Sequence, residues 1–546
     1  MNRAHWQRRA ETDIAASLAQ TPVWDVLVIG GGINGAGIAL EAARRGLTVL
    51  LAEQKDFAWG TSSRSSKLVH GGLRYLKQGQ LQLTRDSVRE RDALMSAAAG
   101  LVEPQSFAFA HYQGRAPGRW MFALGLAVYD CLSGKPAQHY FPRDEFLILS
   151  PHIDTGSLQG GMCYTDAKTD DARLVLRVLQ EAQQHGAMAV NYLKVESLCR
   201  EEGRVCGALL RDQVSQQTMQ VSARLVINAS GVWAGGWQSR SAPEHKLRPL
   251  RGSHLLFPQW RLPVAQAVSL MHPRDGRPVF LYPWEGATLV GTTDVDHAAA
   301  PDLEPQITGA EVSYLMEALD LQFPELRLQT EDIISTYAGV RPVLDSGQSD
   351  PSKESRDHAI WIEDGMISVT GGKLTTFRLM AQEVLRQAAS LLPALASRQT
   401  GNGQPLFAPS AAMPPAGRLR YAQQRRLLGR YGAHAAGLVN AAQADELTLI
   451  PGTETLWAEL RWAAASEAVV HLDDLLLRRT RIGLLRRQGA SECMERIRQI
   501  CQPLLGWSDQ FWDNEAARYL ALIRQCYSLP SADQIPDWQG AAKAGA

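Results

Sequence analysis

Three glycines and a glutamate near the start of the chain have the spacing of a dinucleotide-binding turn. Gly30, Gly32 and Gly35 form G-x-G-x-x-G directly after the apolar run of residues 26–29, and Glu53 follows 18 residues later. Glycine lets a pyrophosphate approach the backbone, a helix N-terminus attracts its charge, and the acid accepts ribose hydroxyl groups. The pattern predicts a bound dinucleotide; the alternative is a structural turn that holds no phosphate.

A polar stretch, TSSRSSKLVHGG (residues 61–72), follows Glu53 within about ten residues. In a nicotinamide enzyme the second strand normally leads into another helix, whereas hydroxyl and amide groups here can bind a long cofactor. FAD is therefore favoured over NAD. The chain has one such glycine fingerprint, so electrons must leave to an acceptor other than a bound nicotinamide. Composition alone favours a solvated surface loop instead.

The elements that position these residues alternate between strands and helices. Residues 24–53 read as strand, glycine turn, helix and strand, and similar patterns recur at 170–190, 223–231 and 367–392. Such βαβ units build a parallel sheet. An α/β domain is predicted over 22–396, with parts at about 22–103, 166–247 and 334–396. The less periodic parts, 104–165 and 248–333, are predicted to form an inserted second domain. A Gly- and Pro-rich linker (397–417) and a helical domain (418–530) follow.

Composition excludes several classes of protein. The chain has 546 residues, 45% of them hydrophobic, and its 56 basic side chains balance 56 acidic ones, so a nucleic-acid partner has no support. The seven cysteines are scattered without a C-x-x-C pair, so we expect no metal site and a reducing compartment. We find no signal peptide and no 18-residue apolar window, which predicts a cytosolic protein or one bound peripherally to a membrane.

The chain resembles the FAD-dependent glycerol-3-phosphate dehydrogenases of the aerobic, respiratory type. The resemblance rests on VIGGGINGAGIA, SSKLVHGGLRYL, YTDAKTDDARLVL, RGSHLLF, YAGVRPVL and TGGKLTTFRLMA, and it covers most of residues 22–530. It implies an FAD-binding, amino-acid-oxidase-like Rossmann fold with an inserted antiparallel-sheet substrate domain and an all-α C-terminal domain. Three features depart from the family pattern: an N-terminal extension, Arg64 where small residues are frequent, and Ser230 in place of a common threonine.

The implied reaction is the oxidation of sn-glycerol 3-phosphate to dihydroxyacetone phosphate, by hydride transfer from carbon 2 to flavin N5. Arg74 and Arg341 are the expected phosphate clamp, since a guanidinium donates two parallel hydrogen bonds to a phosphate. Each arginine has the alternative of pairing with a core carboxylate. Lys373, after a glycine pair at the start of a predicted helix, is expected near the flavin, the substrate phosphate or the reacting oxygen, and Tyr75 is expected to orient the substrate.

The proton acceptor and the cofactor contacts are further expectations from the resemblance. His254 has a suitable ordinary pKa, although a lone histidine in an apolar stretch is more often a core residue. Asp294 either accepts a proton or caps a turn, and the cap is the stronger interpretation. The expected FAD-binding residues are Gly30, Gly32, Asn34, Gly35, Glu53, Thr61, Ser62, Ser63, Ser66, Lys67, His70, Gly71, Gly72, Ser230, Gly231, Gly372, Lys373, Leu374 and Thr375.

A membrane quinone is the expected electron acceptor, so the enzyme is expected on the cytoplasmic face of the inner membrane, in glycerol catabolism. Candidate membrane contacts are residues 1–10 and 115–132, which combine cations with tryptophan, and either segment can instead pack on the protein. A homodimer is possible. The rival functions are a glycerol-3-phosphate oxidase that uses oxygen, a flavin-binding redox-sensing module without turnover, and a nicotinamide dehydrogenase.

Overall fold

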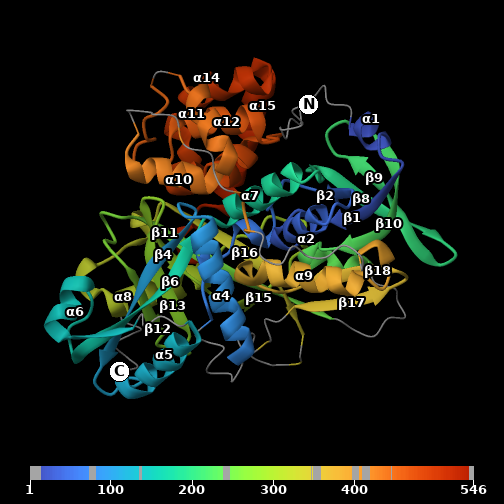
Figure 1. Ribbon diagram of the computed structural model, residues 1–546. Helices are drawn as coiled ribbons and strands as arrows, with labels where there is room; N and C mark the ends of the chain where they lie inside the picture. The colour runs from blue at the N-terminus through green and yellow to red at the C-terminus, as the bar shows by residue number, and fades with distance from the viewer. Residues whose placement is uncertain are drawn as a thin grey trace.

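The computed structural model describes residues 14–72, 81–133, 138–237, 246–345, 347, 354, 358–395, 405–408, 413, 419–443 and 445–539. These residues form two β-sheets and a C-terminal group of helices (Figure 1).

The first sheet has the strand order β17-β18-β10-β1-β2-β7. Its pairs from β18 to β7 are parallel, and β17 is antiparallel to β18. The N-terminal part of β10 pairs with β9, and β9 pairs with β8, so these three segments form an antiparallel ribbon. The strands are β1 (Val23–Ile29), β2 (Val49–Ala52), β7 (Met188–Val190), β8 (Leu193–Glu201), β9 (Arg204–Asp212), β10 (Thr218–Asn228), β17 (Ala359–Glu363) and β18 (Met366–Thr370).

Both faces of the first sheet are covered, which explains its continuous apolar strands. Val26 and Val28 face a core formed with α2, α7 and α9, whereas Leu27 and Ile29 face a second core formed with α1, β8 and β9. Figure 1 shows α7, α2 and α9 side by side along the sheet. The helices up to the linker are α1 (Ile14–Ala19), α2 (Ile33–Arg44), α4 (Leu81–Ala97), α5 (Arg119–Ser133), α6 (Arg143–Leu149), α7 (Asp171–Gln184), α8 (Gly309–Gln322) and α9 (Phe377–Ala388).

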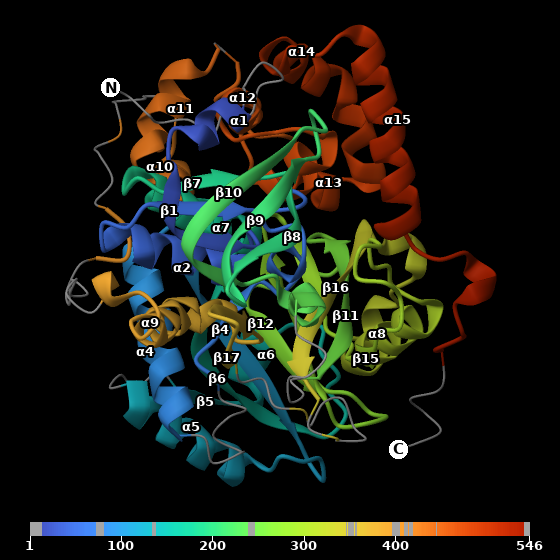
Figure 2. The same ribbon diagram turned by 90° about the vertical axis from the view of Figure 1, so that its right-hand side faces the viewer.

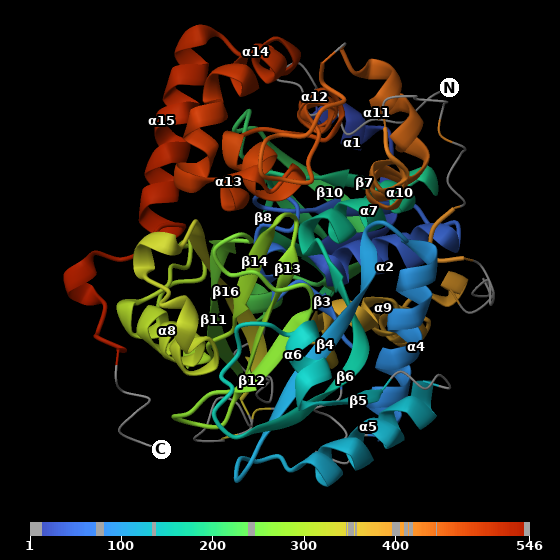
Figure 3. The same ribbon diagram turned by 90° about the vertical axis from the view of Figure 1, so that its left-hand side faces the viewer.

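The second sheet has the order β15-β11-β14-β13-β12-β4-β6-β3, with β16 paired to β11 and β5 paired to β6 (Figure 3). All these pairs are antiparallel except β12 with β4. The strands are β3 (Leu68–Val69), β4 (Val102–Tyr112), β5 (His139–Pro142), β6 (Leu158–Thr169), β11 (Leu247–Pro258), β12 (Ala267–Met271), β13 (Pro278–Trp284), β14 (Ala287–Gly291), β15 (Val295–Asp296) and β16 (Ser335–Leu344).

The C-terminal domain is helical and packs on one side of both sheets, in orange and red at the top of Figure 2. A buried π-helical turn (Asp474–Arg479) joins its two halves and faces α7. Its helices are α10 (Tyr421–Tyr431), α11 (Ala435–Ala441), α12 (Trp457–Ser466), α13 (Ile482–Leu485), α14 (Met494–Leu505) and α15 (Asp509–Cys526).

The predicted fold class is confirmed: an α/β domain, an inserted and largely antiparallel domain, and a helical C-terminal domain. The exact domain boundaries stay a prediction. Two strands, β3 and β16, belong to the second sheet although their residues fall within the segments assigned to the first domain. Within the described residues, no helix combines the length and the apolar character needed to cross a bilayer.

Candidate functional site

A cavity of about 560 Å³ lies where the carboxyl ends of β1, β2 and β10 meet the second sheet. Its walls come from residues around 29–34, 52–54, 59–70, 194–196, 229–237, 341–343 and 371–375, together with Phe280, Thr292 and Asp302. Ligands of open α/β sheets bind at this edge, where the strands end and loops converge. The cavity therefore joins the glycine turn, the polar loop and the GVRP and GGK motifs in one space.

The glycine turn is built for close backbone approach. Gly30 has a φ of +109°, and a Cβ atom on it would lie 2.7 Å from the carbonyl oxygen of Ala229. A Cβ atom on Gly35 would lie 1.9 Å from the carbonyl oxygen of Gly30, so Gly35 packs the turn rather than lining the cavity. Gly32 is the N-cap of α2, and with Asn34 it lines the cavity; the Ser62 hydroxyl accepts the N–H of Ile33, and the positive end of the helix faces the cavity, where it can attract an anion.

Glu53 closes the other side of this turn. Its Oε2 accepts a hydrogen bond from the backbone N–H of Gly31 at 2.6 Å, and its Oε1 accepts one from the N–H of Lys55 at 2.8 Å. Burial raises the pKa of this carboxyl group, and the two N–H groups partly offset that rise. A carboxylate fixed in this way can still accept hydrogen bonds from ribose hydroxyls, because each oxygen has a second lone pair.

The residues present fit an FAD molecule. Gly231 lines the cavity with a φ of +64°, and nothing lies within 4 Å of the point where its Cβ atom would be, so a group can approach the backbone there. Ser230 donates its hydroxyl hydrogen bond to Asn228 at 2.6 Å and fixes this turn. Trp59 and Trp233, with ring centroids 6.1 Å apart, line the cavity near Glu53 and offer apolar surface for a flat ring.

The polar loop divides into a front that faces the cavity and a back that faces the protein interior. Thr61, Ser62, Ser66 and His70 line the cavity, and the Ser62 Oγ accepts a hydrogen bond from the N–H of Ile33 at 3.0 Å. The predicted cofactor contacts that do not line the cavity are Gly35, Ser63, Lys67, Gly71 and Gly72.

Lys67 is fully buried behind the loop, where its Nζ donates hydrogen bonds to the Ser63 carbonyl at 2.9 Å and to Asp171 at 3.0 Å. Gly71 donates its N–H to Asp166 at 2.8 Å, and a Cβ atom on it would lie 2.1 Å from the hydroxyl oxygen of Tyr129. Composition could not separate the two sides of the loop, because serine and lysine suit both a ligand and an internal partner.

His254 lies behind the cavity wall, not on it. Its Nε2 is 2.9 Å from the Oγ of Ser66, which does line the cavity, and its ring stacks on Tyr337 with centroids 4.5 Å apart. The register of β11 with β14 and β16 places His254 opposite both Tyr337 and Gly291, and a Cβ atom on Gly291 would lie 2.1 Å from the imidazole. Burial, with the charges of Lys67 and Arg341, lowers the pKa of His254 well below its ordinary value.

Arg341 brings a cation to the cavity. Its guanidinium lies 3.2 Å from the Oγ1 of Thr292 and 3.4 Å from the carboxylate of Asp294, which Arg277 also contacts at 3.1 Å. Gly252 makes room for it, since a Cβ atom there would lie 2.4 Å from the Arg341 Nη2. Asp294 thus serves mainly as an ionic partner. Thr292, which belongs to the same GTTD motif and lines the cavity, was missed, because threonine in a turn carries no chemical signature.

Lys373, Leu374 and Thr375 form the remaining wall with Gly371 and Gly372. Gly372 has a φ of +78°, and Asn34 donates its side-chain hydrogen bond to the Gly371 carbonyl at 3.1 Å, which ties this turn to the glycine turn of α2. Lys373 precedes a 3-10 turn (Leu374–Thr376), and α9 begins only at Phe377. The prediction that the glycine pair and Lys373 open the long helix was therefore wrong by one turn.

Two predicted substrate contacts, Arg74 and Tyr75, lie outside the described residues. Arg64, the departure from the family pattern, is buried at the cavity edge, where it pairs with Glu304 and contacts the hydroxyl of Tyr527 at 3.3 Å. The larger side chain is accommodated because Glu304 of the inserted domain partners its charge and Tyr527 of the C-terminal domain accepts a hydrogen bond from it. Phe280 also lines the cavity and was not predicted.

Comparisons with known proteins agree with this geometry. The family model of FAD-dependent oxidoreductases matches residues 25–387, and that of the C-terminal domain of alpha-glycerophosphate oxidase matches residues 370–511. A glycerol-3-phosphate dehydrogenase 2 of Mycobacterium tuberculosis (strain H37Rv) is 35% identical over 540 residues, covering 94% of this chain and 90% of the relative. An aerobic glycerol-3-phosphate dehydrogenase of Bacillus subtilis (strain 168) is 39% identical over 368 residues, 66% of each chain.

A solved structure agrees with the fold over nearly the whole chain. The glycerol-3-phosphate dehydrogenase from Bacillus halodurans, complexed with FAD, superimposes with a TM-score of 0.74 and 28% sequence identity, covering 93% of this chain and 96% of that one. The cofactor of this family is thus FAD, as the sequence predicts, and the expectation of an amino-acid-oxidase-like fold is confirmed.

Proposed function

The chain belongs to the FAD-dependent oxidoreductases, among the aerobic glycerol-3-phosphate dehydrogenases, and on this basis we propose that it oxidises sn-glycerol 3-phosphate to dihydroxyacetone phosphate. The observation that carries the proposal is one cavity lined by the dinucleotide turn, by Glu53 and by cations that include Arg341 and Lys373. When bound, FAD supplies the acceptor for the hydride that leaves carbon 2 of the substrate.

The substrate phosphate binds to Arg341. A guanidinium donates two parallel hydrogen bonds to a phosphate, and each charge-assisted bond is worth about 1.5–3 kcal/mol, so the site prefers glycerol phosphate to glycerol. Asp294 holds Arg341 from behind without neutralising the cluster, because Arg277 contacts the same carboxylate. Lys373 adds a second positive charge at the cavity wall. The predicted second arginine, Arg74, remains part of the proposal.

The hydroxyl proton of carbon 2 passes through Ser66 to His254. Ser66 lines the cavity, accepts the substrate proton at its Oγ and donates its own proton to the Nε2 of His254, 2.9 Å away. The imidazole must be neutral to accept it, and a pKa well below the ordinary value keeps it neutral at physiological pH. Hydride loss and proton loss together convert the secondary alcohol into the ketone.

Electrons leave to a membrane quinone, which requires contact with the bilayer. The predicted contact at residues 115–132 includes α5, where Trp120 is 78% exposed, Met121 65% and Leu124 68%. Arg119 lies beside this apolar face and Arg115 precedes it. Large apolar side chains flanked by cations suit the interface of an anionic membrane. We place the enzyme peripherally on the cytoplasmic face of the inner membrane, in glycerol breakdown; a homodimer stays a prediction.

Anaerobic mixing of the yellow protein with sn-glycerol 3-phosphate tests the reaction. We expect loss of the yellow flavin absorbance on reduction, followed by its return when a soluble quinone is added. An unchanged spectrum contradicts the proposed oxidation and leaves a flavin-binding module without turnover. Hydrogen peroxide formed in equal amount to substrate consumed, with no reaction with quinone, contradicts the quinone acceptor and indicates an oxidase.

A further inference from the structure

The polar loop around Ser66 is held by buried residues on its side away from the cavity. We define the serine loop as residues 61–67. Its cavity side includes Ser62 and Ser66, whereas Ser63 and Lys67 are buried against α7 and the C-terminal domain. Tyr337 donates its hydroxyl hydrogen bond to the Ser65 carbonyl at 2.8 Å. The position of Ser66 therefore depends on residues that never reach the cavity.

Asp171, the first residue of α7, holds the loop at two points. Its Oδ2 accepts hydrogen bonds from the backbone N–H of Ser65 at 2.9 Å and from the Ser65 Oγ at 2.8 Å. Its Oδ1 accepts a hydrogen bond from the Nζ of Lys67 at 3.0 Å. Ser66 lies between these two residues, so this single carboxylate fixes both neighbours of the residue that contacts His254.

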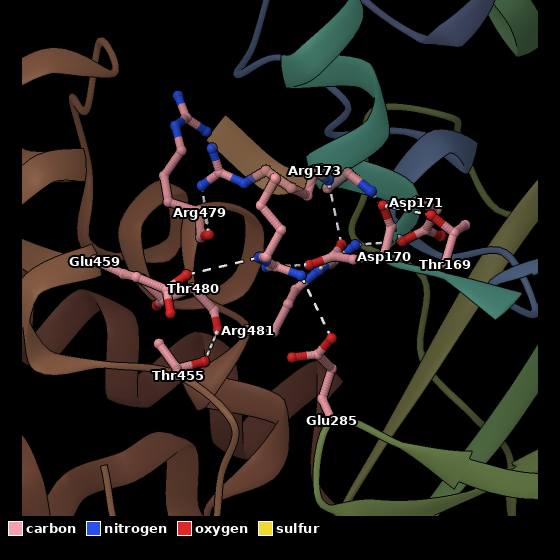
Figure 4. A network of polar contacts seen from close by, with 12 residues as sticks. Thr169, Asp170, Asp171, Arg173, Glu285, Thr455, Glu459, Arg479, Thr480 and Arg481 are labelled. Carbon is pink, nitrogen blue, oxygen red and sulfur yellow. Dashed lines mark hydrogen bonds and ion pairs between the residues drawn. The ribbon is translucent and has the colours of Figure 1, made fainter. Parts of the chain in front are cut away.

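Arg481 of the C-terminal domain holds Asp171 in turn. Its Nε donates to Asp170 at 2.9 Å, its Nη2 pairs with Asp171, and its Nη1 donates to the Ser63 carbonyl at 3.2 Å and to the Leu477 carbonyl at 2.7 Å. Arg481 is 1% exposed, and both aspartates are fully or almost fully buried. Figure 4 shows Asp170, Asp171 and Arg481 where α7 meets the C-terminal domain.

The charges in this cluster depend on one another. Burial alone would raise the pKa of Asp170, but Arg481 and Arg430 hold it well below its ordinary value. Burial, together with the charge of Arg481, lowers the pKa of Lys67 to about 8. Without Arg481, Lys67 would still pair with Asp171 and Arg430 with Asp170, but the hydrogen bonds that tie Asp171 and the Ser63 carbonyl to the C-terminal domain would be lost. The loss of Arg481 would therefore shift Asp171 and the loop that it holds.

We propose that Arg481 is a positioning residue for catalysis: it holds Asp171, and through it the serine loop, in the geometry that presents Ser66 to His254. This inference rests on the proposed role of Ser66 and His254 in proton transfer. It also gives the C-terminal domain a part in the reaction, although within the described residues no side chain of that domain lines the cavity. The serine loop and Arg481 are more than 400 residues apart in sequence and meet only in the folded chain.

A matched pair of substitutions tests the proposal in the FAD-loaded protein. Arg481→Lys keeps a positive charge but loses the fork of hydrogen bonds to Asp170, Asp171 and Ser63. Arg173→Lys makes the same change in another buried contact of α7 with the C-terminal domain, the pair of Arg173 with Glu467 at 2.6 and 3.0 Å, which does not touch the loop. The measurements are kcat, KM for sn-glycerol 3-phosphate, the visible flavin spectrum and the melting temperature.

We expect Arg481→Lys to lower kcat by about 10- to 100-fold with little change in KM, since a displacement of about 1 Å at reacting groups has such an effect. Its flavin spectrum should shift, whereas Arg173→Lys should keep the kcat and the spectrum of the unchanged protein with a lower melting temperature. An unchanged kcat in Arg481→Lys overturns the proposal, and so does an equal loss of kcat in Arg173→Lys, which would indicate a general effect of domain docking.

A second variant keeps the test decisive if Arg481→Lys folds poorly. Ser65→Ala removes the hydroxyl that donates to Asp171 and accepts the N–H of Lys67 within the loop, and we expect it to reduce kcat while FAD stays bound. An unchanged kcat in Ser65→Ala then counts against the proposal. If the unchanged protein is not reduced by sn-glycerol 3-phosphate, the proposed function fails by itself. The comparison of flavin spectra between Arg481→Lys and Arg173→Lys still shows whether Arg481 positions the loop.

Discussion

The Oγ of Ser66 lies 2.9 Å from the Nε2 of His254, although 188 residues separate them in sequence. The contact joins a loop residue that lines the cavity to a buried histidine on β11. In the proposed reaction, it would connect the substrate hydroxyl with a buried base.

Replacing Ser66 by alanine interrupts this contact. We expect Ser66→Ala to lower kcat by about 100-fold or more while KM changes little, because general-base catalysis contributes about 10²- to 10⁴-fold. Steady-state kinetics measure both constants. Ser62→Ala is the control: it alters the loop beside the glycine turn and should weaken FAD binding rather than slow the FAD-saturated enzyme. A normal kcat in Ser66→Ala would remove the relay from the mechanism.

The pH dependence of kcat follows from the protonation state of His254. Its neutral form, the base, is present above its pKa, which burial and the charges of Lys67 and Arg341 lower well below 6.5. Activity should therefore persist through pH 6.5 and fall only as the pH drops through the lowered pKa. The measurement is kcat at saturating substrate, because the phosphate of the free substrate itself titrates near pH 6. His254→Gln should abolish this acid limb, and a limb centred at or above pH 6.5 would contradict the assignment.

The free energy of unfolding should also decrease as the pH falls. Between pH 6.5 and the lowered pKa, the unfolded chain binds a proton at His254 that the folded chain does not, so the free energy of unfolding decreases as the pH falls through this range. Urea unfolding of the unchanged protein and of His254→Gln, compared at pH 7 and pH 5, measures the difference. The variant should lose less stability over that interval than the unchanged protein does.

Arg341→Ala removes one cation of the proposed phosphate clamp. We expect KM for sn-glycerol 3-phosphate to rise about 10- to 100-fold, which corresponds to the loss of about 1.5–3 kcal/mol, with FAD still bound. Gly252→Ala should raise KM while leaving the charge in place, because its Cβ atom would lie 2.4 Å from the Arg341 Nη2. Gly125→Ala on α5, where nothing lies within 4 Å, is the matched control. An unchanged KM in both active-site variants would exclude Arg341 from substrate binding.

The exposed face of α5 can be tested apart from the chemistry. The double variant Trp120→Ala, Leu124→Ala should bind phosphatidylglycerol vesicles at least tenfold more weakly, since each large apolar side chain contributes about 1.5–3 kcal/mol when buried. Co-sedimentation measures binding, and turnover with a soluble acceptor dye should stay unchanged. Trp260→Ala, at a tryptophan that is 80% exposed on another part of the surface, is the control. Equal binding of all three proteins would place the membrane contact elsewhere.

The sequence by itself determined the nucleotide-binding half of the site. Gly30 and Gly32 through their backbone, and Asn34 and Glu53 through their side chains, all belong to one βαβ unit, where spacing along the chain fixes spacing in space. The GVRP and GGK motifs were expected at the site from the family resemblance, and both line the cavity.

Only the tertiary structure decided which side of the serine loop faces the cavity and what stands behind it. Lys67, predicted as a cofactor contact, turns inward to Asp171, and His254 reaches the cavity only through Ser66. These outcomes depend on the register of β11 with β14 and β16 and on Arg481, which the C-terminal domain brings to the back of the loop. A side chain's type limits the partners that it can accept, but packing between distant segments selects among them.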